Sequence, residues 1–159
     1  MFQSTQYKGS KEDQYQLLIK QVDALLDGEP DGIANLSNAS ALLNQFLDDV
    51  NWVGFYIWKQ DELVLGPFQG LPACVRIPSG KGVCGTAVSE GTTQRVYDVN
   101  AFPGHIACDA ASQSEIVVPI FKEEQIFGVL DIDSPSVGRF DETDEKFLTL
   151  FVKTLEKYI

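Results

Sequence analysis

Three cysteines offer the clearest reactive chemistry in this 159-residue chain, and they are widely spaced at Cys74, Cys84 and Cys108. Cys74 and Cys84 lie in apolar stretches, where a thiol usually acts as a small buried hydrophobic group. Cys108 follows His105 in a segment of small and polar residues that should not be fully buried, so it is the better candidate for an accessible thiolate. The adjacent Asp109 argues mildly against this, because a neighbouring negative charge raises a thiol pKa.

A structural zinc site is a second possible use of these thiols. Three cysteines and the single histidine would supply a Cys₃His set. Structural zinc sites normally contain closely spaced cysteine pairs, whereas Cys74 and Cys84, the nearest two here, are ten positions apart. The spacing therefore disfavours zinc, and we expect no metal.

Carboxylates form the second group of interest. Asp131 and Asp133 stand two apart in the otherwise apolar residues 128–133, so in a strand both side chains project from one face. Glu115, just before the apolar residues 116–121, could join them across a hairpin. Because buried carboxylates need a cationic or hydrogen-bonding partner, such a group would suit a substrate with an ammonium group. Alternatively, the two aspartates end the strand in solvent or cap the following turn.

Two aromatic side chains complete the set. Trp52 and Tyr56 have the spacing of one strand face, where their usual role is core packing. The alternative is an apolar wall for a small ligand. A pocket with one apolar wall, several carboxylates and a thiol has the general make-up of a small-molecule site.

Periodicity predicts the elements that position these residues. Helical spacing predicts helices near residues 10–27, 31–48 and 141–158. Residues 98–114 fit neither helix nor strand and predict a long loop, a feature often used for binding or catalysis. Helices at the two ends with strands between them indicate an α+β domain with an antiparallel sheet. The predicted strands are residues 51–58, 62–68, 73–77, 93–96, 116–121 and 126–132.

Composition limits the partners and the location. The chain has 23 acidic and 12 basic residues, a formal charge of −11, which repels nucleic acid and anionic membrane surfaces. It shows no signal-peptide layout and no run of about 18 apolar residues, so we expect a cytoplasmic location. Its length and its 44% apolar content predict a single domain over residues 1–159, with residues 1–9 as a loosely ordered extension.

Seven short motifs, which include all three cysteines, carry a family resemblance. They are N-W-V-G-F-Y at 51–56, L-G-P-F-Q-G at 65–70, A-C-V-R-I-P at 73–78, G-K-G-V-C-G-T-A at 80–87, G-H-I-A-C-D-A-A-S at 104–112, S-E-I-V-V-P at 114–119 and G-V-L-D-I-D-S at 128–134. From about residue 10 to its C-terminus the chain resembles the free methionine-R-sulfoxide reductases, single-domain enzymes of the GAF fold. The resemblance implies an antiparallel sheet of about six strands, flanked by N- and C-terminal helices.

The resemblance also implies an activity, the reduction of free methionine-R-sulfoxide, with a role for each cysteine. Cys108 becomes the nucleophile that takes the sulfoxide oxygen as a sulfenic acid. Cys74 then forms a disulfide with it, with Cys84 as the alternative or auxiliary partner. Thioredoxin is the implied reductant, no metal or organic cofactor is needed, and a homodimer is compatible with the family.

The same resemblance gives roles to the other candidates. Glu115 and Asp133 become the acids or hydrogen-bond partners of the sulfoxide, and Asp131 belongs to the same cluster. Trp52 and Tyr56 match family positions that enclose the methyl group and side chain of the substrate. Asp98 and the backbone of residues 104–114 are weaker candidates for substrate contact.

Two other functions fit part of the sequence. A GAF module that senses a small molecule without catalysis would share the fold, since fold alone does not settle function, but it needs no cysteine trio. A zinc-stabilised interaction domain would bind stoichiometric metal and unfold with a chelator.

Overall fold

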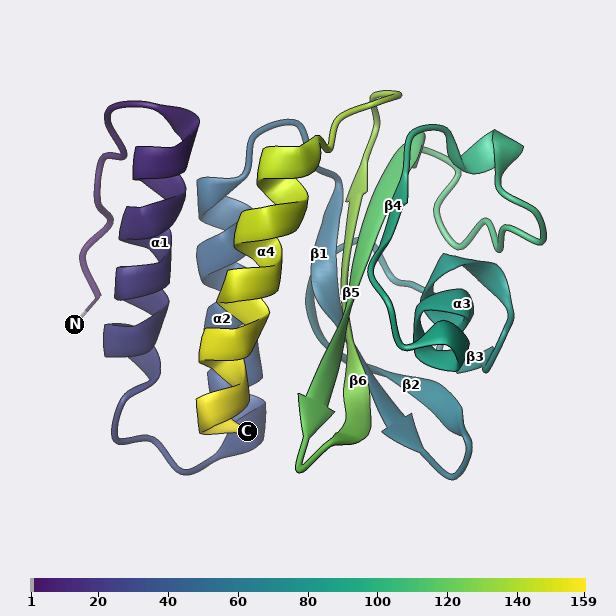
Figure 1. Ribbon diagram of the computed structural model, residues 1–159, viewed down its shortest axis with the longest axis horizontal. Coiled ribbons are helices and arrows are strands. Elements are labelled where there is room, and N and C mark those ends of the chain that lie inside the picture. Colours follow the sequence, from purple (N-terminus) through teal and green to yellow (C-terminus); the bar gives the residue numbers. More distant parts are fainter. Residues whose placement is uncertain (1) are drawn as a thin grey trace.

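A single antiparallel sheet of six strands divides the molecule, with strand order β3-β2-β1-β6-β5-β4 (Figure 1). The computed structural model describes residues 2–159. All neighbouring strands pair antiparallel, and the central hairpin β5–β6 pairs Glu115 with Asp133. This sheet and its helices confirm the expected α+β class. The strands are β1 (Trp52–Lys59), β2 (Glu62–Gly70), β3 (Arg76–Pro78), β4 (Gln94–Val96), β5 (Ser114–Lys122) and β6 (Gln125–Ser134).

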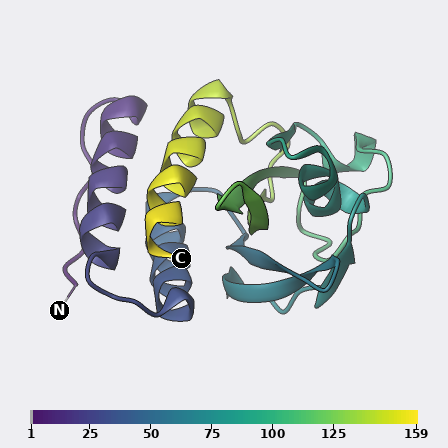
Figure 2. The same cartoon turned by 60° about the horizontal axis from the view of Figure 1, so that its bottom comes forward.

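Three helices cover one face of the sheet, and each lies inside its predicted range. They are α1 (Lys11–Leu26), α2 (Gly32–Phe46) and α4 (Glu142–Leu155), which the 3₁₀ turn η2 (Glu156–Tyr158) extends. They stand together on the left of Figures 1 and 2, with α1 outermost. Apolar side chains from alternate strand positions, such as Val53 with Phe55 and Leu130 with Ile132, pack against this layer. Because side chains alternate along a strand, one face of each central strand is buried beneath the helices.

The helix starts follow from local capping. Ser10 and Asp13 form a capping box at α1, in which each side chain accepts a hydrogen bond from the other residue's N–H. Asp31 caps α2, and Asp141 forms a second capping box with Asp144 at α4. These side chains satisfy helix N–H groups that would otherwise lack partners.

A buried carboxylate ties α1 to α4. Asp144 accepts hydrogen bonds from Oη of Tyr15 at 2.6 Å and Nζ of Lys11 at 2.8 Å. Nη1 of Arg139 lies 3.4 Å from the same carboxylate. Because a buried ion pair is costly to break, this cluster stabilises the packing of the helical layer.

The opposite face of the sheet carries α3 (Gly82–Glu90), the 3₁₀ turn η1 (Val99–Ala101) and two irregular segments, residues 71–75 and 97–113, on the right of Figures 1 and 2. Tyr56, Val83, Val117 and Val129 belong to a second, smaller core on this side. The predicted long loop at residues 98–114 is confirmed, apart from the short turn η1 inside it and from Ser114, which already belongs to β5. The sheet therefore separates two apolar cores.

Helix α3 was not predicted. Gly82, its first residue, has a φ of 62°, and a Cβ atom on Gly85 would lie 2.5 Å from the carbonyl oxygen of Pro78. Gly82 thus adopts the left-handed backbone at the helix start, and Gly85 allows the helix to pack directly on the preceding chain. Because glycine is a poor helix former, a nine-residue segment with two glycines carries little helical signal in the sequence.

The strand predicted at residues 73–77 begins later, at Arg76. The carbonyl oxygen of Val75 still accepts the N–H of Leu65 in β2 at 2.9 Å, whereas aromatic side chains bind two carbonyl groups of residues 71–74. Nε1 of Trp52 donates to the carbonyl oxygen of Leu71 at 3.2 Å, and Oη of Tyr56 donates to that of Cys74 at 2.9 Å. Cys74 therefore lies in an irregular segment rather than in the strand where we had expected it.

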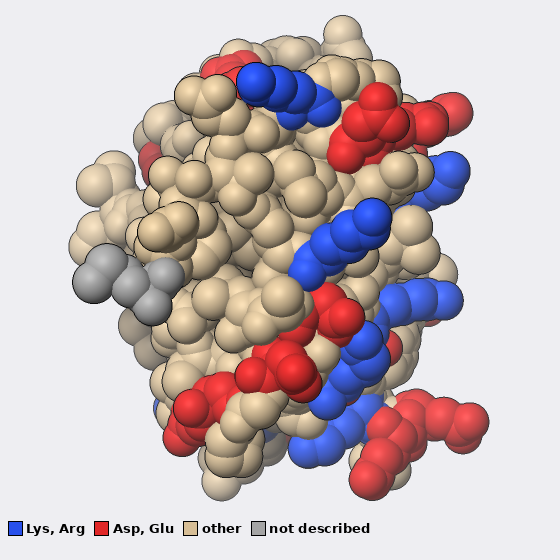
Figure 3. Space-filling model, turned by 90° about the vertical axis from the view of Figure 1, so that its left-hand side faces the viewer, with Lys and Arg blue, Asp and Glu red and all other residues tan. Residues whose placement is uncertain are grey.

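The chain before α1 is irregular but contacts the helical layer. Residues 2–9 contain no helix or strand, and Met1 lies outside the described residues. Tyr7 packs edge-on against Phe46, with ring centroids 4.7 Å apart. The domain limits and the loose order of residues 1–9 stay predictions. Acidic and basic side chains lie side by side on the face in Figure 3, and no helix in residues 2–159 could span a membrane.

Candidate active site

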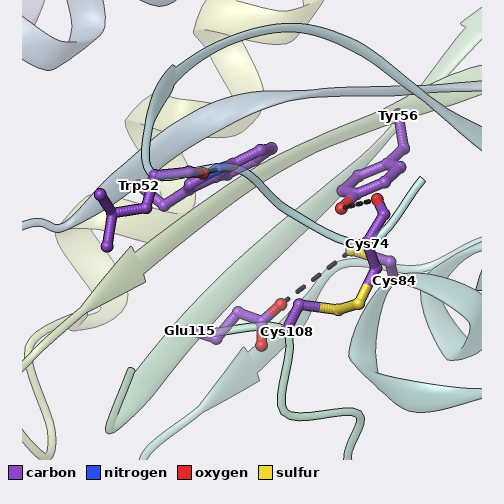
Figure 4. Close-up of a disulfide and its surroundings, with 7 residues drawn as sticks. Trp52, Tyr56, Cys74, Cys84, Cys108 and Glu115 are labelled. Atoms are coloured by element: carbon purple, nitrogen blue, oxygen red, sulfur yellow. Dashed lines mark hydrogen bonds between the residues drawn. A yellow bond between two sulfur atoms is a disulfide. The ribbon is translucent and has the colours of Figure 1, made fainter. Parts of the chain in front are cut away.

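A disulfide between Cys74 and Cys108 lies on the α3 side of the sheet (Figure 4). It joins the segment before β3 to the long loop, with 5.5 Å between the two Cα atoms. Both residues are half-buried and neither lies in a helix or strand. Two of the four groups of the Cys₃His set are thus bonded to each other in this structure. Cys74 and Cys108 are the pair that the family resemblance implied.

A pocket lies next to this disulfide, and four carboxylates line it, including that of Asp109. Cys108, Glu115, Asp131 and Asp133 all contribute to its surface, as does Cys84. Glu115 and Asp133 are direct partners across the β5–β6 hairpin, and Asp131 lies two residues further along the same face. Glu115 is 7% exposed and Asp131 6% exposed. The aspartates therefore do not end the strand in solvent, and the predicted cluster on one sheet face is confirmed.

Burial of these acids changes their protonation. Burial first, and then the charges of Asp131 and Asp133, raise the pKa of Glu115 well above its usual range. Burial and the Asp131 charge do the same for the pKa of Asp133. Burial raises the pKa of Asp131 to about 6, although hydrogen bonds with Glu115 and Cys84 act in the opposite direction. The cluster therefore retains protons near neutral pH and can donate one to a ligand.

Three buried acceptor atoms beside the pocket or at its edge have no hydrogen-bond partner among the described residues: Oδ1 of Asn51, of Asp131 and of Asp133. None of the salt bridges within residues 2–159 involves Glu115 or either aspartate. Arg139, the nearest basic residue in the sequence, instead contacts Asp144 on the helical side. Buried acceptor atoms without donors are unfavourable. A ligand with several N–H groups could donate hydrogen bonds to these oxygens.

The apolar wall of the pocket comes from β1. Trp52 stacks on Tyr56, with ring centroids 5.8 Å apart, and on Phe68, at 5.1 Å. A Cβ atom on Gly54 would lie 2.2 Å from Cβ of Phe68, and one on Gly70 would lie 2.5 Å from Cδ1 of Trp52. The stack therefore requires glycine at both positions. Through their hydrogen bonds to Leu71 and Cys74, the same aromatic rings also position the disulfide segment.

Cys84 is the remaining thiol. It lies in α3, is buried, and forms no disulfide. Its Sγ is 4.0 Å from Oε1 of Glu115, as the dashed line in Figure 4 marks. Burial and the nearby Asp131 and Glu115 charges raise its pKa well above the usual range. Cys84 is therefore a neutral thiol on the pocket floor, in agreement with its prediction as a buried cysteine.

Sequence reasoning missed the residue that holds the loop in place. Nδ2 of Asn51 donates to Oδ2 of Asp109 at 3.0 Å and to Oγ of Ser112 at 3.1 Å. Its backbone N–H donates to the carbonyl oxygen of Asp133 at 2.9 Å. Asn51 thus fixes the Cys108 loop against β6, which carries Asp131 and Asp133. The one sequence signal for this role is the presence of a polar residue at the start of an apolar strand.

Two other loop residues differ in their relation to the pocket. Asp98 caps η1 by accepting the N–H of Asn100 at 2.9 Å and does not line the pocket. His105 does line it, and burial lowers the pKa of its imidazole. The expectation that Asp98 contacts substrate therefore has no geometric support, because its carboxylate is used as a cap.

The fold and the site define a GAF domain, and residues 31–159 match that family. The free methionine-R-sulfoxide reductase of Escherichia coli (strain K12) is 55% identical over 150 residues, which cover 94% of this chain and 91% of that protein. The structure of fRMsr of Staphylococcus aureus in its reduced form has a TM-score of 0.89 and 59% identity, covering 98% of this chain and 99% of that one. The free methionine-R-sulfoxide reductase of Neisseria meningitidis, in complex with its substrate, has a TM-score of 0.93 and 46% identity, covering 98% of this chain and 94% of that one. This chain belongs to the GAF domain family and, within it, to the free methionine-R-sulfoxide reductases.

Proposed function

We propose that this protein reduces free methionine-R-sulfoxide to methionine, with Cys108 as the nucleophile. The observation that carries the proposal is the disulfide of Cys108 with Cys74 at a pocket with buried carboxylates on its floor. A thiol pair that can cycle between two redox states beside a proton donor is what sulfoxide reduction requires. The relatives named free methionine-R-sulfoxide reductase support the same substrate.

In the first step the thiolate of Cys108 attacks the sulfoxide sulfur. Because an oxide is a poor leaving group, the oxygen needs a proton, and Glu115 or Asp133 can supply it since burial raises the pKa of both. The oxygen is transferred to the cysteine sulfur, the substrate sulfur is reduced by two electrons, and methionine leaves. Cys108 is then a sulfenic acid.

In the second step the thiol of Cys74 attacks the sulfenic sulfur. A disulfide forms and the oxygen leaves as water. The structure holds these two cysteines in a bond, which supports Cys74 rather than Cys84 as the resolving cysteine. We further propose that the dithiol of thioredoxin reduces the disulfide, which requires a reducing compartment such as the cytoplasm. A homodimer stays a prediction.

The charge of the pocket accounts for the choice of a free amino acid. The unpartnered oxygens of Asp131 and Asp133 can accept hydrogen bonds from an ammonium group. A methionine within a peptide has no ammonium group to offer. Trp52 and Tyr56 provide apolar surface for the methyl group and side chain.

Turnover distinguishes this function from that of a sensor module. With thioredoxin, thioredoxin reductase and NADPH, we expect oxidation of NADPH with free methionine-R-sulfoxide and almost none with the S epimer or a sulfoxide-containing peptide. Cys108→Ser should abolish turnover, and Cys74→Ser should allow one turnover without recycling. Cys84→Ser is the matched control, which should still recycle. Binding without turnover would favour the sensor, and equal rates on peptide and free substrate would contradict the ammonium argument.

A further inference from the structure

The proposed reaction leaves one group on the pocket floor without a role, the thiol of Cys84. One ligand atom from each of Cys84, Glu115 and Asp131 lies within 4.8 Å of the other two, and all three residues are buried. In the disulfide form Cys84 is also the free thiol of the chain. Three buried groups of metal-binding type, on α3, β5 and β6, therefore converge on one point.

A second observation points to a missing cation. Oδ1 of Asp131 is buried with no hydrogen-bond partner among the described residues, and the residue is 6% exposed and lines the pocket. Among the lysines and arginines, Lys81 lines the pocket. It is exposed and forms no salt bridge with Glu115, Asp131 or Asp133. The pocket floor thus holds several acidic groups and a buried acceptor atom that no donor of the described residues satisfies.

We propose that Cys84, Glu115 and Asp131 bind a thiophilic divalent cation of the Zn²⁺ class, and that this cation excludes substrate from the pocket. A thiolate with two carboxylates suits Zn²⁺ better than Mg²⁺ or Ca²⁺, which prefer oxygen ligands alone. In a tetrahedral site the ligand atoms are about 3.4–3.6 Å apart, so closing the largest gap needs about 1 Å of side-chain movement. The fourth position would face the pocket, which is also the entry route.

This site differs from the Cys₃His set that the cysteine spacing disfavours. It uses one cysteine and no histidine, and its ligands are available while Cys74 and Cys108 are bonded. Its consequence for activity rests on the proposed function, because Glu115 and Asp131 would serve both the cation and the substrate. The cation would therefore act as a competitive inhibitor of the reductase.

Cobalt tests the binding directly, because a thiolate bound to Co²⁺ gives a charge-transfer absorption band that carboxylates do not. Co²⁺ added to the disulfide form should produce this band at one equivalent, and Zn²⁺ should remove it. Cys84→Ser should abolish the band, and Asp131→Asn should weaken Co²⁺ binding at least tenfold. His105→Ala is the matched control, because it removes a common metal ligand from the pocket wall without touching the cluster. Thermal unfolding of each variant identifies any that fail to fold.

The absence of the band, or its survival in Cys84→Ser, would overturn the proposal, as would its loss in His105→Ala. Competition with substrate is measured on the double variant Cys74→Ser with Cys108→Ser, in which Cys84 is again the free thiol and no turnover occurs. Free methionine-R-sulfoxide should weaken Co²⁺ binding there. If Co²⁺ binds but the sulfoxide has no effect, exclusion of substrate is refuted while the metal site stands. If turnover assays fail but the band appears, the proposed function alone is refuted.

Discussion

Replacing Asp131 by asparagine should stabilise the protein at neutral pH although it damages the active site. Raising the pKa of this buried carboxyl from 3.8 to about 6 corresponds to about 3 kcal/mol. Because the folded pKa lies above the unfolded one, the folded protein keeps a proton that the unfolded chain has lost between these values. Stability from this group is therefore complete below about pH 4 and is lost as the pH rises through 6.

Asp131→Asn removes this dependence. Its free energy of unfolding should match that of the parent near pH 4 and exceed it by up to about 3 kcal/mol at pH 7.5. Urea denaturation at several pH values measures the free energy of unfolding of the variant and of the parent, under conditions that keep the disulfide intact. Asp27→Asn is the matched control, because Asp27 is an exposed aspartate at the end of α1. A difference that is constant with pH, or a variant less stable at pH 7.5, would refute the reasoning.

Four further predictions follow from the same structure. Turnover should decline toward alkaline pH, because Glu115 and Asp133, whose pKa values burial raises well above their usual range, lose the proton that the sulfoxide oxygen needs; a rate that does not decline at high pH would contradict acid catalysis by these carboxyls. Asn51→Ala should lower kcat with little change in the melting temperature, because it releases the Cys108 loop, and steady-state kinetics with calorimetry would show this. Gly54→Ala should destabilise the fold by about 1–3 kcal/mol in chemical denaturation, because the added methyl overlaps Phe68. Asp144→Ala should cost about 3–5 kcal/mol of stability without affecting the chemistry of refolded enzyme, since it leaves buried partners unpaired on the helical side; a loss under 1 kcal/mol would contradict this.

The architecture was predictable where periodicity and caps agree. All three long helices lie inside their expected ranges because apolar spacing marks their buried faces and Ser10, Asp31 and Asp141 cap their starts. The hairpin of β5 and β6 was predictable from two apolar runs with a polar turn between them. These signals are local, so one sequence is enough to detect them.

The elements that were missed depend on contacts that apolar periodicity does not report. Helix α3 packs against Pro78 because residue 85 is glycine, and Trp52 and Tyr56 hold the carbonyl groups of Leu71 and Cys74 outside the strand. Trp52 lies 19 positions before Leu71, and Tyr56 lies 18 positions before Cys74, so local periodicity does not reveal these two contacts. Tertiary packing therefore overrode local propensity at the site itself.

The candidate site was partly predictable in the same way. That Asp131 and Asp133 project from the same face follows from strand alternation alone. The position of Glu115 opposite Asp133 follows once the register of the hairpin is known. The pairing of Cys74 with Cys108 did not follow from spacing and rested on the family resemblance. The role of Asn51 needed coordinates, because its partners lie 58 and 61 positions further along the chain.

The sheet divides the molecule into a helical side and a pocket side, and this division affects how the sequence of such a protein can change during evolution. The helical side and the pocket side share backbone in the central strands but place different side chains on each face. Substitutions among the helices therefore alter lifetime and expression while the reactive groups keep their positions. Replacements around α3 and the long loop can instead create a new specificity on an inherited scaffold. One lineage can thus exchange its ligand without having to invent a new way to fold.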